Sequence, residues 1–283
     1  MNLNKLIKYV RNLYFRFYDD EVPALGAQLA YYFLLSFFPF LIFLVTMIGY
    51  TTLSSEEVLR ELSNILPQNA YALIYDSISH ITNRKNGGLL SFGIVTTLWA
   101  ASNGVGAAVR GLNKAYDEEE ERPLWKIKGI AILFTVALAV VILLSFILLI
   151  FGQQIGIYLA KWLGMAGFFH AIWDTLRYII MLLIMVLIFA AFYRYIPNRR
   201  LMWKEVIPGA IFATIGWILI SLGFAYYVNN FGNYSRIYGS IGGAIVLLIW
   251  LFFSAMVILM GGELNATLAF DREGKEKPHG KRY

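Results

Sequence analysis

Polar side chains inside long apolar stretches are the residues of this 283-residue sequence that could carry chemistry. In the stretch 89–112, Thr96, Asn103 and Arg110 follow one another at intervals of seven residues, so on a helix they share one face. An amide and a guanidinium on an apolar helix can bind a polar headgroup, or they can form hydrogen bonds to neighbouring helices. The sequence leaves both interpretations open.

Further candidates for binding a substrate lie on the other apolar stretches: Gln28, Tyr32, Arg194 and Glu263. Glu263 is separated from Tyr238 by about 37 Å of helix at about 1.5 Å per residue. This distance predicts that Glu263 lies near the membrane interface, at a depth similar to that of Arg110 and Arg194. An ion pair between Glu263 and one of these arginines is one hypothesis, and a role in proton coupling is the alternative.

Pro39 lies in the middle of the first apolar stretch. A proline there removes a backbone hydrogen bond and bends the helix, so Pro39 is a candidate hinge. Aromatic and polar residues also gather between the last two stretches, where the candidates for an outer-face contact are Tyr234, Arg236 and Tyr238. An aromatic belt at the membrane interface would explain the same residues without a ligand.

The composition is that of a membrane protein. Hydrophobic residues make up 59% of the chain and charged residues 15%, against about 45–50% and about 25% in soluble domains. Apolar stretches long enough to cross a hydrocarbon core of about 30 Å occur at about 28–50, 89–112, 129–152, 178–195, 206–228 and 241–260. We therefore predict an all-α polytopic membrane protein with six transmembrane helices. Residues 1–270 form a single integral membrane domain, and 271–283 form a basic cytoplasmic tail.

The basic residues predict the orientation. Eighteen of the 24 Lys and Arg residues fall in the N-terminal segment, two connections and the tail, which places both termini in the cytoplasm by the positive-inside rule. Residues 3–17 and parts of 51–87 have the periodicity of interfacial amphipathic helices. The helix at 3–17 could equally pack against the cytoplasmic ends of the bundle. The acidic run 117–121 is interpreted as a solvated face.

Several functional classes are disfavoured or excluded. The chain has no cysteine, so it cannot hold a thiolate zinc site or an iron–sulfur cluster. It has no phosphate-loop motif, and His80, His170 and His279 fall on both sides of the predicted membrane. We expect no catalytic residues, no metal and no cofactor. We also expect no nucleic-acid partner, because the basic residues are spread over four segments.

Seven short stretches together resemble the YihY/BrkB family of bacterial inner-membrane proteins, over about residues 5–270. They are 26–32, 37–39, 99–103, 193–197, 208–210, 238–240 and 261–266. The resemblance implies a location in the bacterial cytoplasmic (inner) membrane and, for some members, lipid handling in the envelope. The family also carries an old ribonuclease BN-like label. We expect no such enzyme activity, since phosphodiester hydrolysis needs converging carboxylates or histidines.

Three functions are compatible with these observations. The first is a transporter or flippase-like permease for a lipid or lipid-linked amphiphile, with membrane lipids as partners. The second is a non-transporting scaffold that recruits an envelope partner protein or a second copy of the chain, and the third is a small-ion permease. Transport predicts one polar cavity lined by Gln28, Asn103, Arg110 and Glu263. A scaffold predicts that these side chains bond to one another across tightly packed helices.

Overall fold

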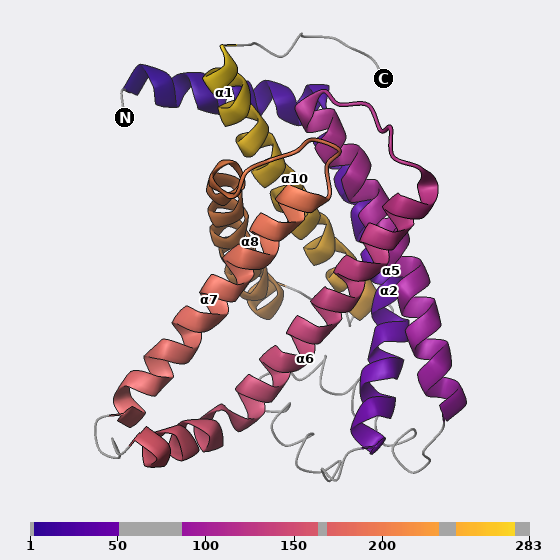
Figure 1. Ribbon diagram of the computed structural model, residues 1–283, viewed down its shortest axis with the longest axis vertical. Helices are drawn as coiled ribbons and strands as arrows, with labels where there is room; N and C mark the ends of the chain where they lie inside the picture. Colours follow the sequence, from indigo (N-terminus) through magenta and orange to yellow (C-terminus); the bar gives the residue numbers. More distant parts are fainter. Residues whose placement is uncertain (1–2, 51–86, 164–168, 232–241, 275–283) are drawn as a thin grey trace. The chain divides into compact units, whose positions relative to one another are not determined.

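The computed structural model describes residues 3–50, 87–163, 169–231 and 242–274 (Figure 1). These ranges contain seven α-helices and no strand: α1 (Leu3–Asp19), α2 (Val22–Tyr50), α5 (Gly87–Tyr116), α6 (Leu124–Leu163), α7 (Phe169–Tyr195), α8 (Trp203–Phe231) and α10 (Gly242–Glu273). Six of them, all except α1, are long and apolar enough to cross a membrane. The predicted all-α class with six spans is confirmed.

The helices extend beyond the apolar stretches that predicted them. Helix α6 has 40 residues, or about 60 Å at about 1.5 Å per residue, although its predicted span covers only 129–152. Helix α10 continues past residue 260 to Glu273. Both extensions carry polar residues. A helix can continue past the end of its apolar stretch, so composition alone did not locate these helix ends. The predicted helices within 51–86 lie outside the described residues.

The chain divides into two compact units. Unit 1 comprises Met1–Leu34, Ala101–Phe134 and Ile184–Tyr283, and unit 2 comprises Leu35–Ala100 and Thr135–Leu183. Helices α1, α8 and α10 belong to unit 1, and α2, α5, α6 and α7 each contribute one end to each unit. The contacts that matter for function below are all within unit 1.

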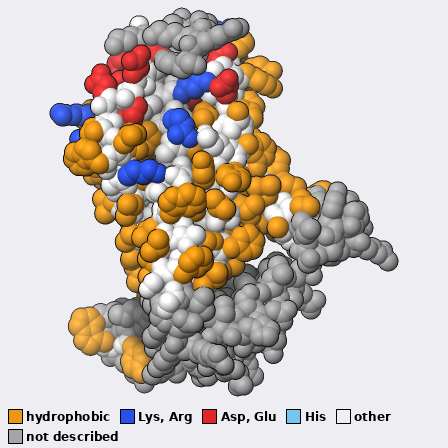
Figure 2. Space-filling model, turned by 90° about the vertical axis from the view of Figure 1, so that its right-hand side faces the viewer, with side chains coloured by type: hydrophobic (Ala, Val, Ile, Leu, Met, Phe, Trp, Pro, Cys, Tyr) orange, Lys and Arg blue, Asp and Glu red, His pale blue; other side chains and the backbone are white. Residues whose placement is uncertain are grey.

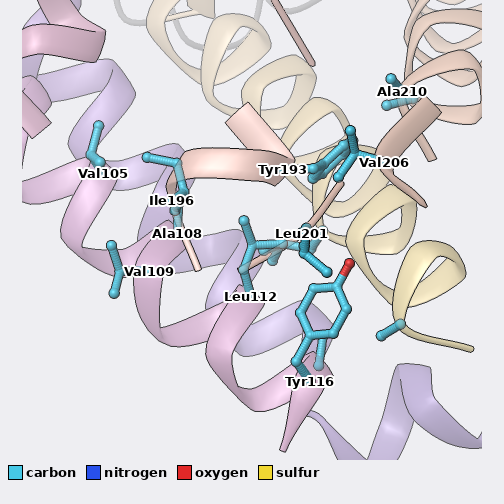
Figure 3. Packing of buried hydrophobic residues seen from close by; sticks show 14 of the residues in the cluster. Val105, Ala108, Val109, Leu112, Tyr116, Tyr193, Ile196, Leu201, Val206 and Ala210 are labelled. Atoms are coloured by element: carbon cyan, nitrogen blue, oxygen red, sulfur yellow. The ribbon is translucent and has the colours of Figure 1, made fainter. Parts of the chain in front are cut away.

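The core of unit 1 is packed mainly by small and branched side chains. On α5, Ala107, Ala108 and Leu112 are fully buried. Figure 3 shows Leu112 and Tyr116 of α5 gathered with Leu201 and Val206. Because alanine takes little space, the backbones of neighbouring helices can approach closely.

The closest approach described in unit 1 is between α8 and α10. A Cβ atom at Gly209 would overlap the carbonyl oxygen of Gly261 and would lie 2.6 Å from Cγ of Asn265. The Asn265 side chain accepts a hydrogen bond from the Gly209 N–H at 2.7 Å and donates one to the Val206 carbonyl at 3.1 Å. This amide therefore satisfies backbone groups of α8 in the turn that contains Pro208, where a helix bends.

Substituting Gly209 with alanine should destabilise the protein by about 1–3 kcal/mol, the usual effect of overpacking. The added methyl group has no space between α8 and α10. The matched control is Gly223→Ala on the same helix, where a Cβ meets nothing within 4 Å and alanine should be neutral or stabilising by up to about 1 kcal/mol. Thermal unfolding in detergent micelles measures both. Equal stability of the two variants would contradict the close packing of α8 against α10 at Gly209.

Candidate functional site

A buried ion pair joins α1 to α10. Nη1 of Arg16 lies 3.2 Å from Oε2 of Glu263, and the two side chains are only 9% and 2% exposed. The same Nη1 donates to the Ala115 carbonyl at 3.2 Å, and the guanidinium lies 5.2 Å from the ring centre of Phe270. Arg16 therefore ties together the ends of α1, α5 and α10.

This pair corrects one expectation. Glu263 does pair with an arginine, but the structure gives it Arg16 rather than Arg110 or Arg194. The polar side of α1 that carries Arg16 packs against the protein, which is one of the two arrangements left open for the helix at 3–17, and a buried carboxylate on α10 needs a cation there. The two residues are 247 positions apart in the chain.

The middle of α1 is also held by α10. Nζ of Lys8 lies 3.3 Å from one carboxylate oxygen of Asp271, and the Tyr9 hydroxyl donates to the other at 2.8 Å. This hydrogen bond, together with slight burial, raises the pKa of Tyr9. The N-terminal helix and the end of α10 thus lie at the same end of unit 1. Which side of the membrane this is remains a prediction.

A hydrogen-bond network fixes the connection between α5 and α6. Asn113 donates to Glu120 at 2.8 Å and accepts a hydrogen bond from the Asn198 N–H at 2.7 Å. Arg122 donates to Glu120 at 2.6 Å and to the Ile196 carbonyl at 2.8 Å. Partial burial acts to raise the pKa of Glu120, but the bonds from Arg122 and Asn113 outweigh it, so this pKa is lowered. The acidic run is therefore not simply a solvated face.

Arg199 extends the network to α10. It forms ion pairs with Glu118, at 3.7 Å, and with Glu273. Its guanidinium also lies 5.6 Å from the ring centre of Tyr116 and 5.9 Å from that of Phe270. Among the described residues, no group of three or more His, Cys, Asp or Glu side chains could hold a metal ion.

The sequence-predicted site residues do not all come together. Tyr32 packs inside unit 1, where its Cβ lies 3.3 Å from the position of a Cβ at Gly104. Arg194 places its guanidinium 4.8 Å from the ring centre of Trp203. Gln28 is half-buried on α2.

The remaining candidates are Pro39 and the outer-face residues. In unit 2, α2 continues as a helix through the candidate hinge Pro39. The candidate outer-face residues Tyr234, Arg236 and Tyr238 lie outside the described residues.

Asn103 and Arg110 lie on one face of α5, and Lys128 of α6 adds a second cation beside Asn103. Lys128 donates to Oδ1 of Asn103 at 2.6 Å. Nη1 of Arg110 lies 4.0 Å from the position of a Cβ at Gly106, so the guanidinium extends back along α5. Residues three apart on a helix are neighbours, about 5–6 Å between Cβ atoms. The two cations therefore lie on adjacent turns, and we call Asn103, Gly106, Arg110 and Lys128 the basic niche.

The basic niche differs from the ion pairs of α1 and α5 because, among the described residues, no carboxylate is bonded to its cations. Lys114, one turn further along α5, is 2.9 Å from Glu21, and Arg16 pairs with Glu263. Arg110 is exposed, and within the described part of the chain it has no hydrogen bond or ion pair. On the face drawn in Figure 2, Lys and Arg side chains lie between acidic and hydrophobic ones.

The spacing in the sequence singled out Asn103 and Arg110 but not Lys128. In the sequence alone, Lys128 is one of the many basic residues that indicate orientation. Its position at the start of a span, on the helix that follows α5, was the one available signal.

Comparisons with known proteins agree on a family of membrane proteins. The family model described as virulence factor BrkB matches residues 13–283. The ribonuclease-like protein YfkH of Bacillus subtilis is 44% identical over 263 residues, which cover 93% of this chain and 95% of YfkH. A UPF0761 membrane protein of Alteromonas mediterranea is 28% identical, with 93% and 88% covered. A third relative, from Tolumonas auensis, is 28% identical, with 89% and 82% covered. No solved structure matches significantly.

Removing one partner of the buried ion pair should strongly destabilise the protein. In Arg16→Gln or Glu263→Gln, the remaining buried charge is uncompensated, which costs about 3–5 kcal/mol. The double variant Arg16→Met with Glu263→Leu should lose less than either single variant, because no charge is left buried. As a control, Lys8→Gln removes a more exposed pair and should cost about 1 kcal/mol or less. Additive losses in the double variant, measured by unfolding in micelles, would contradict the pairing.

Stability should also depend on Glu120 at acidic pH. Because the folded state lowers the pKa of this carboxyl, its stabilising contribution is present above its ordinary pKa, about 4.3. That contribution is lost as the pH falls through the lowered value. Glu120→Gln should therefore be less stable than wild type near neutral pH, and the difference should shrink on acidification. Glu121→Gln, at an exposed position of the same connection, is the control. A difference in stability between Glu120→Gln and wild type that does not change with pH would contradict this prediction.

Proposed function

This chain belongs to the virulence factor BrkB family, and from that premise we propose that it is a permease for anionic lipids or lipid-linked amphiphiles. Its membrane is the cytoplasmic membrane of a bacterium, and its partners are membrane lipids. The proposal includes no enzyme activity and no cofactor. The words ribonuclease-like belong to the name of the relative YfkH. In support of the proposal, Glu118 and Glu120 of the acidic run are engaged by basic side chains.

The proposal is carried by Arg110, a cation inside a membrane span that has no partner within the described part of the chain. The span Ser91–Tyr116 ends six residues beyond it, which is about 9 Å at about 1.5 Å per residue. A charged side chain at such a depth is costly unless an anion or water meets it, so an intramembrane arginine indicates a functional site. The guanidinium fork fits a phosphate group well.

The surroundings of the basic niche favour a lipid over a soluble anion. Lys128 adds a second positive charge, and Gly106 leaves space for a headgroup because it has no side chain. Ile132 follows Lys128 by four residues on the same face of α6 and is 44% exposed, while the neighbouring Leu133 is 67% exposed. A ligand with its phosphate at the niche would therefore place acyl chains along apolar side chains.

An envelope scaffold remains the alternative, because one observation favours it. Glu263 bonds to Arg16 across closely packed helices rather than lining a cavity with Asn103 and Arg110, although its partner is not one of the residues that the scaffold hypothesis named. Asn103 and Arg110, however, face outward beside Lys128 rather than bonding to Glu263. The transport and scaffold hypotheses therefore make different predictions for Arg110.

Substituting Arg110 with glutamine should slow lipid movement. The protein is reconstituted into vesicles of phosphatidylglycerol and phosphatidylcholine that contain fluorescent phosphatidylglycerol, and the rate at which the label becomes accessible to an impermeant quencher is measured. Losing one charge-assisted hydrogen bond, about 1.5–3 kcal/mol, should reduce the wild-type rate by about 10-fold or more. Lys128→Gln should act in the same direction.

The matched control is Lys126→Gln, at an exposed position two residues from Lys128, which should keep the wild-type rate. Arg110→Gln transporting at the wild-type rate, at equal amounts of folded protein, would refute the role of the niche. Wild-type protein that moves no lipid would favour the scaffold.

A further inference from the structure

Helix α1 is oriented in the opposite way to a surface helix of a soluble protein. Its polar residues Lys8, Tyr9 and Arg16 bind the other helices of unit 1. Large apolar or aromatic side chains face away from the protein: Ile7, Val10, Tyr14 and Tyr18, which are 58%, 61%, 61% and 60% exposed. Their spacing of three and four residues places them in one row, which we call the outer stripe.

The outer stripe is one continuous surface with a cation at its edge. The rings of Tyr14 and Tyr18 are 5.2 Å apart in an edge-to-face arrangement. Arg11 is exposed and lies four residues from Ile7 and three from Tyr14, so it borders the same stripe. Aliphatic residues, tyrosines and an arginine together form the composition of helices that lie at a membrane surface.

Two spanning helices fix the depth of α1. Its last residue, Asp19, is three positions before the α2 span, which begins at Val22. Its middle is bound through Lys8 to Asp271, two residues before α10 ends at Glu273. Figure 1 shows α1 running across the end of α10 rather than continuing the line of α2. The end of α1 at Asp19 therefore lies where the α2 span begins, and its middle lies against the polar end of α10.

We propose that the outer stripe of α1 is a docking surface for the lipid bilayer itself, in the leaflet where α10 ends. Ile7 and Val10 enter the boundary between headgroups and acyl chains, and the tyrosine hydroxyls stay at headgroup level. Arg11 recruits anionic phospholipid. The contacts of Lys8, Tyr9 and Arg16 hold the helix so that this stripe, and no other face, meets the lipid. This inference does not depend on whether the protein transports lipid.

The bilayer fits the outer stripe better than a second copy of the chain does. Stable protein interfaces bury about 800 Å² on each partner over a broad patch, whereas the outer stripe is a single row of side chains on one helix. Its bordering arginine also complements an anionic leaflet, which attracts basic residues at the membrane surface.

The test uses the full chain, which contains no native cysteine, with a fluorescent label at Tyr14→Cys in vesicles of phosphatidylglycerol and phosphatidylcholine. We expect the label to be quenched by lipids brominated near the headgroup and to be protected from aqueous iodide. The reference is Glu119→Cys at an exposed position between spans, where iodide should quench and brominated lipid should not. Val10→Cys repeats the test on the same stripe if the first variant folds poorly.

Two results would overturn the proposal. Quenching by iodide at residue 14 would place the outer stripe in water, and protection from both quenchers would show that protein covers it.

Lipid selectivity tests the role of Arg11 separately. At equal mole fraction, brominated phosphatidylglycerol should be enriched over brominated phosphatidylcholine beside residue 14 by up to about fivefold, the effect of one basic residue. Arg11→Gln should remove this enrichment while leaving the quenching itself. Equal enrichment with and without Arg11 would overturn its assignment.

Discussion

The ion pair between Arg16 and Glu263 is the interaction on which the arrangement of unit 1 depends. A carboxylate that is 2% exposed near the end of a spanning helix is stable only if a cation accompanies it. The cation comes from α1, so α1 must turn its polar side toward α10 and its outer stripe away from the protein. The same guanidinium binds the Ala115 carbonyl, which brings the end of α5 to this point. Unit 1 is also closely packed where α8 meets α10, and there Gly209 of α8 has no space for a side chain.

The pairing of charges within unit 1 connects the Arg16–Glu263 ion pair to the proposed function. Around the end of unit 1, the carboxylates of Glu21, Glu120 and Asp271 already have basic partners. The basic niche is different, because Lys128 faces an amide and Arg110 has no partner in the described part of the chain. The carboxylates named above are neutralised within the protein, whereas the face of α5 and α6 at the niche keeps a net positive charge among the described residues. In a membrane, the anion available to such a site is a lipid phosphate.

The sequence was sufficient for the features that depend on local spacing. Apolar length located the six spans, and the seven-residue interval placed Asn103 and Arg110 on one face. The sequence alone could not identify the partner of Glu263, because Arg16 is 247 residues away. A polar helix face also has the same residue pattern whether it contacts water or a carboxylate. Lys128 resembled any lysine that orients a span. The role of Asn265 was also hidden, because its amide replaces backbone hydrogen bonds of a helix distant in sequence.

Whether the basic niche holds a lipid phosphate is best measured by an experimental structure in lipid nanodiscs that contain phosphatidylglycerol. We expect elongated density whose head lies within hydrogen-bonding distance of Arg110 and Lys128 and whose tail follows α6 past Ile132. Arg110 bonded to a protein carboxylate, with no lipid density beside Gly106, would contradict it.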